Sequence, residues 1–230
     1  MSVTVTNEQQ KLVRMAARAL GRNGLAHAYG HCSQRLDDTH MLVCAPRPMG
    51  LLEAEEDGIV VPIEGPLPDN VLGEVRLHQR IYQRRPQIKG VCRSMPPALM
   101  NLSALERVPR PRHGMGSYFW PQPAYWPHVE LIRHDELADR AIDTMGDSPA
   151  LVMRGNGVVV CAEDLRKACV LTWFLENAAL IELEALRCGA GNKGMLTEAE
   201  ANARATWNGG IAERMWDWLT RNDDERTPAS

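Results

Sequence analysis

Several common sequence features are absent from this chain, and each absence excludes a class of protein. No Ser/Gly/Pro-rich linker divides the 230 residues, which are enough for one sizeable core, so we expect a single domain over 1–230. There is no basic arm or block of like charge, and the formal net charge of -3 argues against nucleic acid as a partner. No apolar run approaches membrane-spanning length, so we expect no membrane partner either.

The N-terminus and the cysteines indicate the expected compartment. Residues 1–6 lack the basic segment followed by an apolar one that marks a secretory signal. The six cysteines include no Cys-x-x-Cys pair, which is typical of buried free thiols in a reducing compartment rather than of a disulfide scaffold. We therefore expect a cytoplasmic protein.

The most informative residues lie in the middle of the chain. Glu74 and His78 are four residues apart, so they share one face of a predicted amphipathic helix. Apolar residues over 88–92 then predict a buried strand. The strand must be short, because two prolines that cannot donate a ladder hydrogen bond follow soon afterwards. The helix therefore presents a carboxylate toward Arg93 and Ser94, where the strand ends.

The rest of the sequence predicts helices near both ends and strands between them. Helices are expected over 6–20, 136–145, 163–187 and 197–218, strands over 30–35, 41–44, 59–61, 150–153 and 158–161, and an ordered aromatic loop over 109–126. Asn156-Gly157 between two apolar runs indicates a hairpin. This order favours an α+β domain whose sheet is largely antiparallel.

Several motifs resemble the class II aldolase/adducin family over about residues 8–190. Residues 30–35, Gly-His-Cys-Ser-Gln-Arg, are similar to a Gly-His/Asn-x-Ser-x-Arg turn, and Glu74 to His78 is similar to a Glu-x-x-x-His helix. Pro46-Arg47 and Pro96-Pro97 look like the decarboxylase branch of the family. The resemblance implies a layered α/β/α class II aldolase-like domain with a C-terminal helical extension over 195–222. It also implies a homotetramer with sites between subunits.

The same resemblance shows where the sequence departs from the family. Members bind a divalent metal through two histidines of a His-x-His-Pro strand end and one of a His-Gly hairpin. Aligned on the shared Pro and Gly, this chain has Arg93, Met95 and Asn156 at those positions. A guanidinium has no lone pair to donate, and a thioether is a poor ligand for a hard cation. We therefore expect no metal ligands here and no cofactor.

Arg93, Glu74 and His78 are the candidate catalytic residues. The Arg93 guanidinium could replace the metal as an electron sink, since a preorganised donor can stabilise an oxyanion by roughly 3 kcal/mol. Glu74 would transfer the proton. Each residue has a structural alternative: Arg93 merely pairs with Glu74 in a decayed site, Glu74 complements the helix dipole, and His78 orients Glu74 or bonds a carbonyl.

The remaining candidates would hold an anionic substrate. They are His31, Ser33, Arg35, Arg47, Ser94, Asn156 and Tyr118. Arg35 could instead brace the sheet, Asn156 could serve only the hairpin turn, and Tyr118 with its aromatic neighbours could form a subunit interface.

These observations predict a carbon–carbon lyase, decarboxylase-like or aldolase-like, that acts on a small anionic substrate such as an aromatic acid without the usual metal. Two alternatives stay open at this point. One is a catalytically silent domain that binds a ligand or a protein, and the other is an isomerase or cyclase on the same fold. An open basic cleft would favour an enzyme, and a cleft filled by its own side chains would favour the silent domain.

Overall fold

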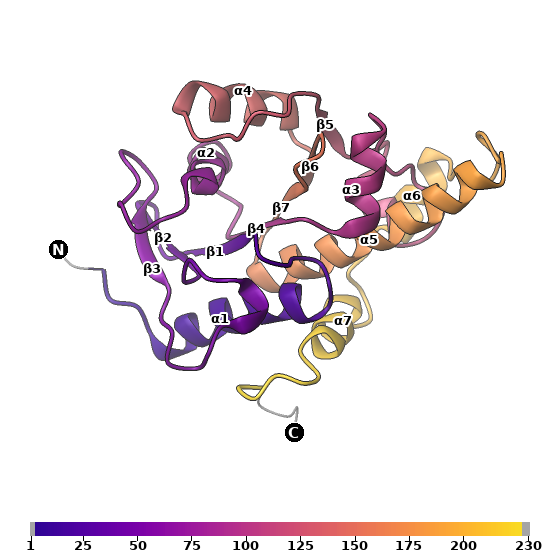
Figure 1. Cartoon of the computed structure of the whole chain (residues 1–230). Coiled ribbons are helices and arrows are strands. Elements are labelled where there is room, and N and C mark those ends of the chain that lie inside the picture. The colour runs from indigo at the N-terminus through magenta and orange to yellow at the C-terminus, as the bar shows by residue number, and fades with distance from the viewer. Residues whose placement is uncertain (1–2, 227–230) are drawn as a thin grey trace.

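A single twisted sheet lies between two layers of helices (Figure 1). The computed structural model describes residues 3–226. Its strands are β1 (His31–Arg35), β2 (His40–Val43), β3 (Ile59–Pro62), β4 (Gly90–Ser94), β5 (Ala124–Trp126), β6 (Ala150–Met153) and β7 (Val158–Ala162). They follow the order β3-β2-β1-β4-β7-β6-β5, and every pairing is antiparallel except the parallel pair β5–β6. The predicted α+β class and the largely antiparallel sheet are confirmed.

The helices cover both faces of this sheet, as the predicted α/β/α layering requires. They are α1 (Asn7–Arg22), α2 (Arg76–Arg84), α3 (Pro97–Ala104), α4 (Asp135–Met145), α5 (Leu165–Arg187), α6 (Glu198–Arg204) and α7 (Ile211–Leu219). In Figure 1, α1, α5 and α7 lie below the sheet, and α2 and α4 lie above it. Each face of the sheet has its own hydrophobic core, and successive residues of a strand alternate between them. Cys92 and Val160 pack in the core on the side of α1 and α5, whereas Val91 and Val159 pack in the core on the side of α2 and α4.

Two predicted helix boundaries are wrong and one short helix was not predicted, each for a local reason. A 3-10 turn, Gly73–Val75, contains Glu74, so α2 begins only at Arg76. Pro97 was predicted only to end the preceding strand. In the structure α3 also starts at Pro97, because proline suits the first position of a helix. The helix predicted over 197–218 is split into α6 and α7 by Gly209 and Gly210, whose φ values of 76° and 69° are left-handed.

The cysteines behave as the sequence predicts. All six are free, five of them are buried, and only Cys188 is exposed. Among the described residues, no helix combines the length and the apolar character needed to cross a bilayer.

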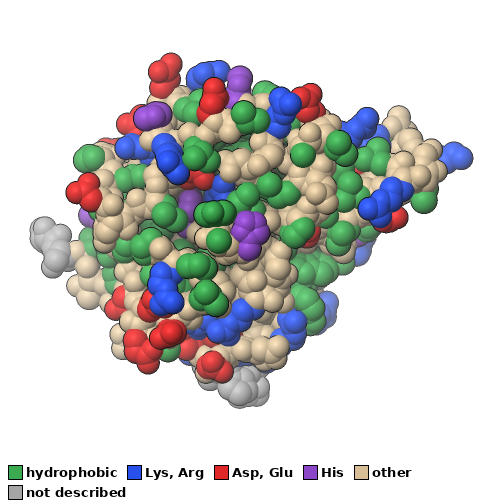
Figure 2. Space-filling view, in the orientation of Figure 1, with side chains coloured by type: hydrophobic (Ala, Val, Ile, Leu, Met, Phe, Trp, Pro, Cys, Tyr) green, Lys and Arg blue, Asp and Glu red, His purple; other side chains and the backbone are tan. Residues whose placement is uncertain are grey.

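Helices α2 and α4, which frame the candidate site, are joined by charge pairs on their outer surface. Three arginines of α2 and three aspartates of α4, each set spaced four residues apart, face one another: Arg76, Arg80 and Arg84 with Asp135, Asp139 and Asp143. Figure 2 shows basic and acidic side chains interspersed along this edge. Because the pairs are partly exposed, they fix the register of the two helices more than they add stability.

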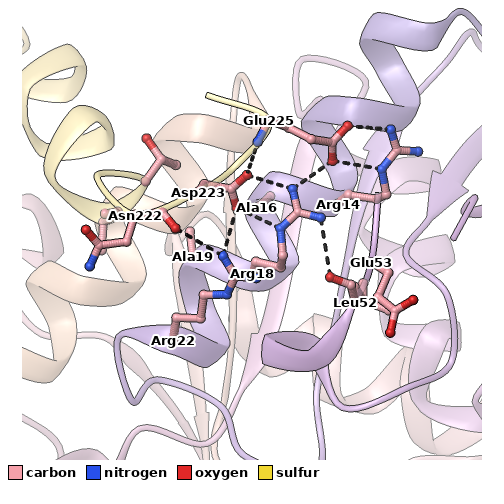
Figure 3. Close-up of polar contacts among 12 residues, drawn as sticks. Arg14, Ala16, Arg18, Ala19, Arg22, Leu52, Glu53, Asn222, Asp223 and Glu225 are labelled. Carbon is pink, nitrogen blue, oxygen red and sulfur yellow. Dashed lines mark hydrogen bonds and ion pairs between the residues drawn. The ribbon is translucent and has the colours of Figure 1, made fainter. Parts of the chain in front are cut away.

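A buried charge network ties the C-terminal segment to α1 (Figure 3). The Arg18 guanidinium is 3% exposed and donates through Nε and Nη2 to both oxygens of Asp223, each at 2.7 Å. Arg18 Nη2 also donates to Glu225 at 2.7 Å, and Arg14 donates to both oxygens of Glu225 at 3.0 and 2.7 Å. Two arginines of one helix thus hold two carboxylates that follow α7.

This network predicts a loss of stability in acid. Burial raises the pKa of Glu225, but the hydrogen bonds and charges of Arg14 and Arg18 outweigh it, so the pKa lies below the ordinary value of 4.5. A carboxyl whose pKa falls on folding stabilises the protein above its unfolded pKa and loses that effect as the pH falls through the folded pKa. We expect the free energy of unfolding in urea to decline below about pH 4.5 and the decline to be shallower in Glu225→Gln.

The control for this prediction is an exposed carboxylate on α5. Glu184 is 64% exposed and pairs only with Arg187 on the surface, so Glu184→Gln should leave the acid slope unchanged. An identical slope in Glu225→Gln and the wild type would contradict the prediction.

Candidate active site

Strand alternation places the predicted site residues on one face of the sheet. His31 and Arg93 are directly opposed in the antiparallel pair β1–β4, so their side chains leave the same face as neighbours. Ser33 lies two residues further along β1 and shares that face. This is the face that α2 and α4 cover, so the first turn of α2 lies over these three side chains.

Arg93, Glu74 and Asn156 form a closed cluster beyond the end of β4. Arg93 Nη2 lies 2.9 Å from Glu74 Oε2 and donates to Asn156 Oδ1 at 2.6 Å and to its backbone oxygen at 3.2 Å. Asn156 Nδ2 in turn donates to Glu74 Oε1 at 3.0 Å. Glu74 Oε1 also accepts the backbone N–H of Ile132 at 3.4 Å. Three residues far apart in sequence are therefore held by mutual hydrogen bonds.

The guanidinium of Arg93 is buried, and part of its hydrogen-bonding capacity has no partner among the described residues. Arg93 is 2% exposed, and all its contacts run through Nη2, whereas its buried Nε has no hydrogen-bond partner among the described residues. Burial lowers the pKa of Arg93 and the charge of Glu74 opposes that shift. Since arginine does not deprotonate in proteins, the site keeps a permanent cation with unused donors.

The β6–β7 hairpin brings Asn156 to this cluster. Gly157 has a φ of 76°, and a Cβ added there would lie 2.1 Å from the backbone oxygen of Ser94. Only glycine allows the turn to approach the end of β4 so closely. Asn156 N–H closes the turn onto Met153 O at 3.1 Å. Asn156 therefore serves the hairpin through its backbone and the cluster through its side chain.

A second polar group, the His31 chain, lies beside the cluster and consists of His31, His78, Ser33 and Tyr82. His31 Nδ1 is 2.9 Å from His78 Nε2, and His78 Nδ1 is 2.7 Å from Ser33 Oγ. Tyr82 Oη lies 3.0 Å from Ser33 Oγ and donates to Ser33 O at 3.0 Å. Burial and Arg93 lower the pKa of His78 to about 3, and burial, His78 and Arg93 lower that of His31, so both rings are neutral at pH 7.

His78 does not orient Glu74, contrary to one prediction. It belongs to the His31 chain, and no hydrogen bond joins it to Glu74. Tyr82 was not predicted as a site residue, although it follows His78 by four residues and so lies on the same face of α2. That spacing was the available signal. Glu74, in the preceding 3-10 turn, points instead to Arg93 and Asn156.

Four other predicted substrate residues lie outside the cluster. Arg35, at the far end of β1, braces the sheet by donating to the backbone oxygens of Ile88 and Tyr82. Arg47 is exposed and pairs with a surface glutamate. Ser94 is fully buried on the opposite sheet face, and Tyr118 packs on Phe174 and Trp207 and donates to the Thr206 backbone oxygen.

The donor set of the cluster does not fit a divalent cation. Of the side chains that come together, Arg93 offers only N–H donors, the Asn156 side-chain oxygen accepts from Arg93, and the two Glu74 oxygens accept from Arg93, Asn156 and the Ile132 N–H. Met95 follows β4 and its backbone N–H bonds Leu25 O at 3.0 Å. Among the described residues, no three His, Cys, Asp or Glu side chains form a possible metal site.

Open space near the cluster is small within one chain. His31 lines a cavity of about 10 Å³ with apolar walls that include Val43, Val71 and Val75, which is room for about one water molecule. A much larger cavity, about 610 Å³, lies near Arg35 at the opposite end of β1, between the start of α5 and α7. The cluster itself is thus filled by its own side chains.

Comparison with known proteins defines the class of this chain. The profile of the class II aldolase and adducin N-terminal domain matches residues 10–183, and the chain belongs to this family. It is 27% identical to a 3,4-dihydroxyphthalate decarboxylase of Arthrobacter keyseri over 80% of this chain and 81% of that one. A protein of the same name from Terrabacter sp. strain DBF63 is 24% identical, with 83% and 86% covered.

Solved structures agree with the fold. An aldolase II superfamily protein from Pseudomonas syringae superposes with a TM-score of 0.75 at 21% identity, covering 96% of this chain and 93% of that one. The predicted family and its decarboxylase-like branch are confirmed, as is the class II aldolase fold.

Proposed function

We propose that this protein is a carbon–carbon lyase of the decarboxylase type that acts on a small hydroxylated aromatic acid without a metal ion. Family membership and relatives named as decarboxylases support a lyase-type activity. The finer proposal depends on one observation: the fixed cation of Arg93, with an unpartnered Nε, lies 2.9 Å from the carboxylate of Glu74. A donor and a proton carrier are therefore side by side.

In the proposed reaction, Arg93 binds the anionic oxygens of the substrate through donors that its own contacts leave free. The bond between the ring and the carboxylate breaks, and its electron pair stays with the ring, whose developing charge Arg93 stabilises. Carbon dioxide leaves, and Glu74, a carboxylate in its pair with Arg93, takes a proton from solvent and passes it to the ring carbon that lost the carboxylate. Glu74 is then a carboxylate again, and one proton from solvent is consumed for each carbon dioxide released.

A second copy of the chain would complete the site. Exposed apolar side chains lie close in sequence to residues of the cluster and of the His31 chain: Tyr29 precedes His31, Leu72 precedes Glu74, and Val129 and Leu131 precede Ile132, whose N–H bonds Glu74. Figure 2 shows apolar side chains gathered around the middle of this face. We propose that they pack against neighbours in a homotetramer, whose mass light scattering would measure.

The absence of a cofactor and the cytoplasmic location stay predictions.

One observation favours a second candidate function, a catalytically silent domain that binds a ligand or a protein. The Arg93 charge is already paired with Glu74, and the adjoining cavity admits about one water molecule. A decayed site would have the same appearance in a single chain. The lyase proposal differs from it by requiring that a substrate reach the free donors of Arg93.

Turnover separates the two candidates. The purified oligomer is incubated with carboxyl-labelled hydroxybenzoic and dihydroxyphthalic acids in the presence of a chelator, and labelled carbon dioxide is measured. The lyase proposal predicts release from at least one of these acids. If no acid of this panel releases carbon dioxide, yet one binds with measurable affinity, the silent domain is the better account.

A further inference from the structure

The hydrogen-bond chain beside the cluster ends in a ring nitrogen with no partner. His31 Nδ1 faces His78, and among the residues that the structure describes nothing is hydrogen-bonded to His31 Nε2. The same ring lines the water-sized cavity, whose nearby walls are mostly apolar. What His31 Nε2 can do there depends on whether it carries a proton.

The protons of the chain can be ordered in two ways. In the first, Tyr82 donates to Ser33 O, Ser33 Oγ donates to Tyr82 Oη, His78 Nδ1 donates to Ser33 Oγ, and His31 Nδ1 donates to His78 Nε2. In the second, Tyr82 donates either to Ser33 O or to Ser33 Oγ, Ser33 Oγ donates to His78 Nδ1, and His78 Nε2 donates to His31 Nδ1. The heavy-atom distances of 2.7 to 3.0 Å admit both orders, so the network must decide between them.

Counting donors decides the order. The first arrangement uses four protons in four hydrogen bonds, whereas the second makes three and leaves Tyr82 Oη without a donor. One additional hydrogen bond corresponds to about a fivefold difference in population. The missing bond is the one to Tyr82 Oη, and because Ser33 and Tyr82 are 0% and 1% exposed, water does not supply it.

We propose that Tyr82 is a positioning residue that sets the tautomer of His31, so that His31 Nε2 is an unprotonated acceptor for a hydroxyl group of the substrate. His31 and Arg93 are opposed across β1–β4, so a ligand whose carboxylate meets Arg93 places a neighbouring hydroxyl near His31. The water-sized cavity accepts one hydroxyl oxygen. The ligand part of this proposal rests on the proposed function, whereas the tautomer part does not.

The tautomer is measured first, on the ligand-free protein. Nitrogen-15 spectra of the histidine rings should show His31 protonated at Nδ1 in the wild type. In Tyr82→Phe the Ser33 hydroxyl loses its acceptor, and each order then makes two hydrogen bonds, so His31 should be protonated at Nδ1 and at Nε2 in about equal amounts. Tyr125→Phe removes a hydroxyl that bonds only Ser103 O, at 3.3 Å, and should leave both signals unchanged.

Ligand binding then tests the hydroxyl preference, with 3-hydroxybenzoate and 3-methoxybenzoate as probes. The wild type should prefer the hydroxyl form by about fivefold, the effect of one hydrogen bond, and Tyr82→Phe, in which only part of the protein keeps Nε2 unprotonated, should show a smaller preference. A wild-type His31 protonated at Nε2, or unchanged tautomers in Tyr82→Phe, would overturn the positioning role. Equal affinity of the two probes would overturn the proposal that His31 Nε2 accepts a substrate hydroxyl. It would not affect the tautomer result, and the carbon dioxide assay tests the proposed function separately.

Discussion

Replacing Arg93 with Gln is expected to reduce carbon dioxide release by about 100-fold or more, the usual effect of removing one preorganised donor from an oxyanion site. The introduced amide can still bond Asn156 or Glu74, but it carries no charge to stabilise the electrons left on the ring. Arg93→Lys keeps the charge without the planar fork, so its rate should lie between those of the wild type and Arg93→Gln. Rates are measured from labelled carbon dioxide at saturating substrate.

Stability must be separated from catalysis in this experiment, because Arg93→Gln leaves Glu74 as an unpaired charge near the core. Removing one partner of a buried pair typically destabilises a protein by about 3–5 kcal/mol, whereas removing both can be nearly neutral. We therefore expect the double variant Arg93→Gln/Glu74→Gln to regain stability in urea but no activity. Full activity in both Arg93→Gln and Glu74→Gln as single variants would refute the mechanism.

Replacing Arg18 with Ala should destabilise the protein by about 3–5 kcal/mol, since it leaves the buried Asp223 carboxylate without its hydrogen-bonded cation. The side chains of Arg18 and Asp223 are each 3% exposed, and Arg18 also holds Glu225. The total stability of most domains is only about 5–15 kcal/mol, so the change is large. The midpoint of urea unfolding, followed by circular dichroism, measures it.

Arg22 provides the matched control for this prediction. It lies one helical turn after Arg18 and approaches the same Asp223 carboxylate at 3.7 Å, but its side chain is 39% exposed. Exposed pairs contribute about 0–1 kcal/mol, so Arg22→Ala should leave the midpoint almost unchanged. If Arg18→Ala and Arg22→Ala have equal effects, burial of the network is not what holds the C-terminal segment to α1.

The sheet was predictable because its signals are local. Apolar runs bounded by turn residues located β2, β3, β4, β6 and β7, the polar turn before β2 located β1 as its partner, and the glycine turn at Gly157 located the hairpin. The parallel edge strand β5 was not predicted, since only its pairing with β6 orders three residues of an aromatic loop. The break at Gly209 and Gly210 was missed because the capping box at Thr197 and the tryptophans suggested one continuous helix.

The site was partly predictable because the motifs that carry the family resemblance are short and local in sequence. The resemblance named Arg93, Glu74 and Asn156, and the structure brings these three together. Arg35 and Ser94 were misplaced because motif membership does not say which end or face of a strand a side chain occupies. The partnership of His78 with Ser33 and His31 depends on β1 lying under α2, a tertiary contact that spacing alone cannot reveal.

The most direct test of the central claim measures metal content and carbon dioxide release on the same purified sample. Mass spectrometry counts zinc and manganese per chain before and after dialysis against a chelator, and the release assay follows each step. If Arg93 acts in place of a metal ion, the metal content is far below one ion per chain and the rate does not change on dialysis. One zinc or manganese ion per chain, whose removal abolishes release and whose return restores it, would contradict the account.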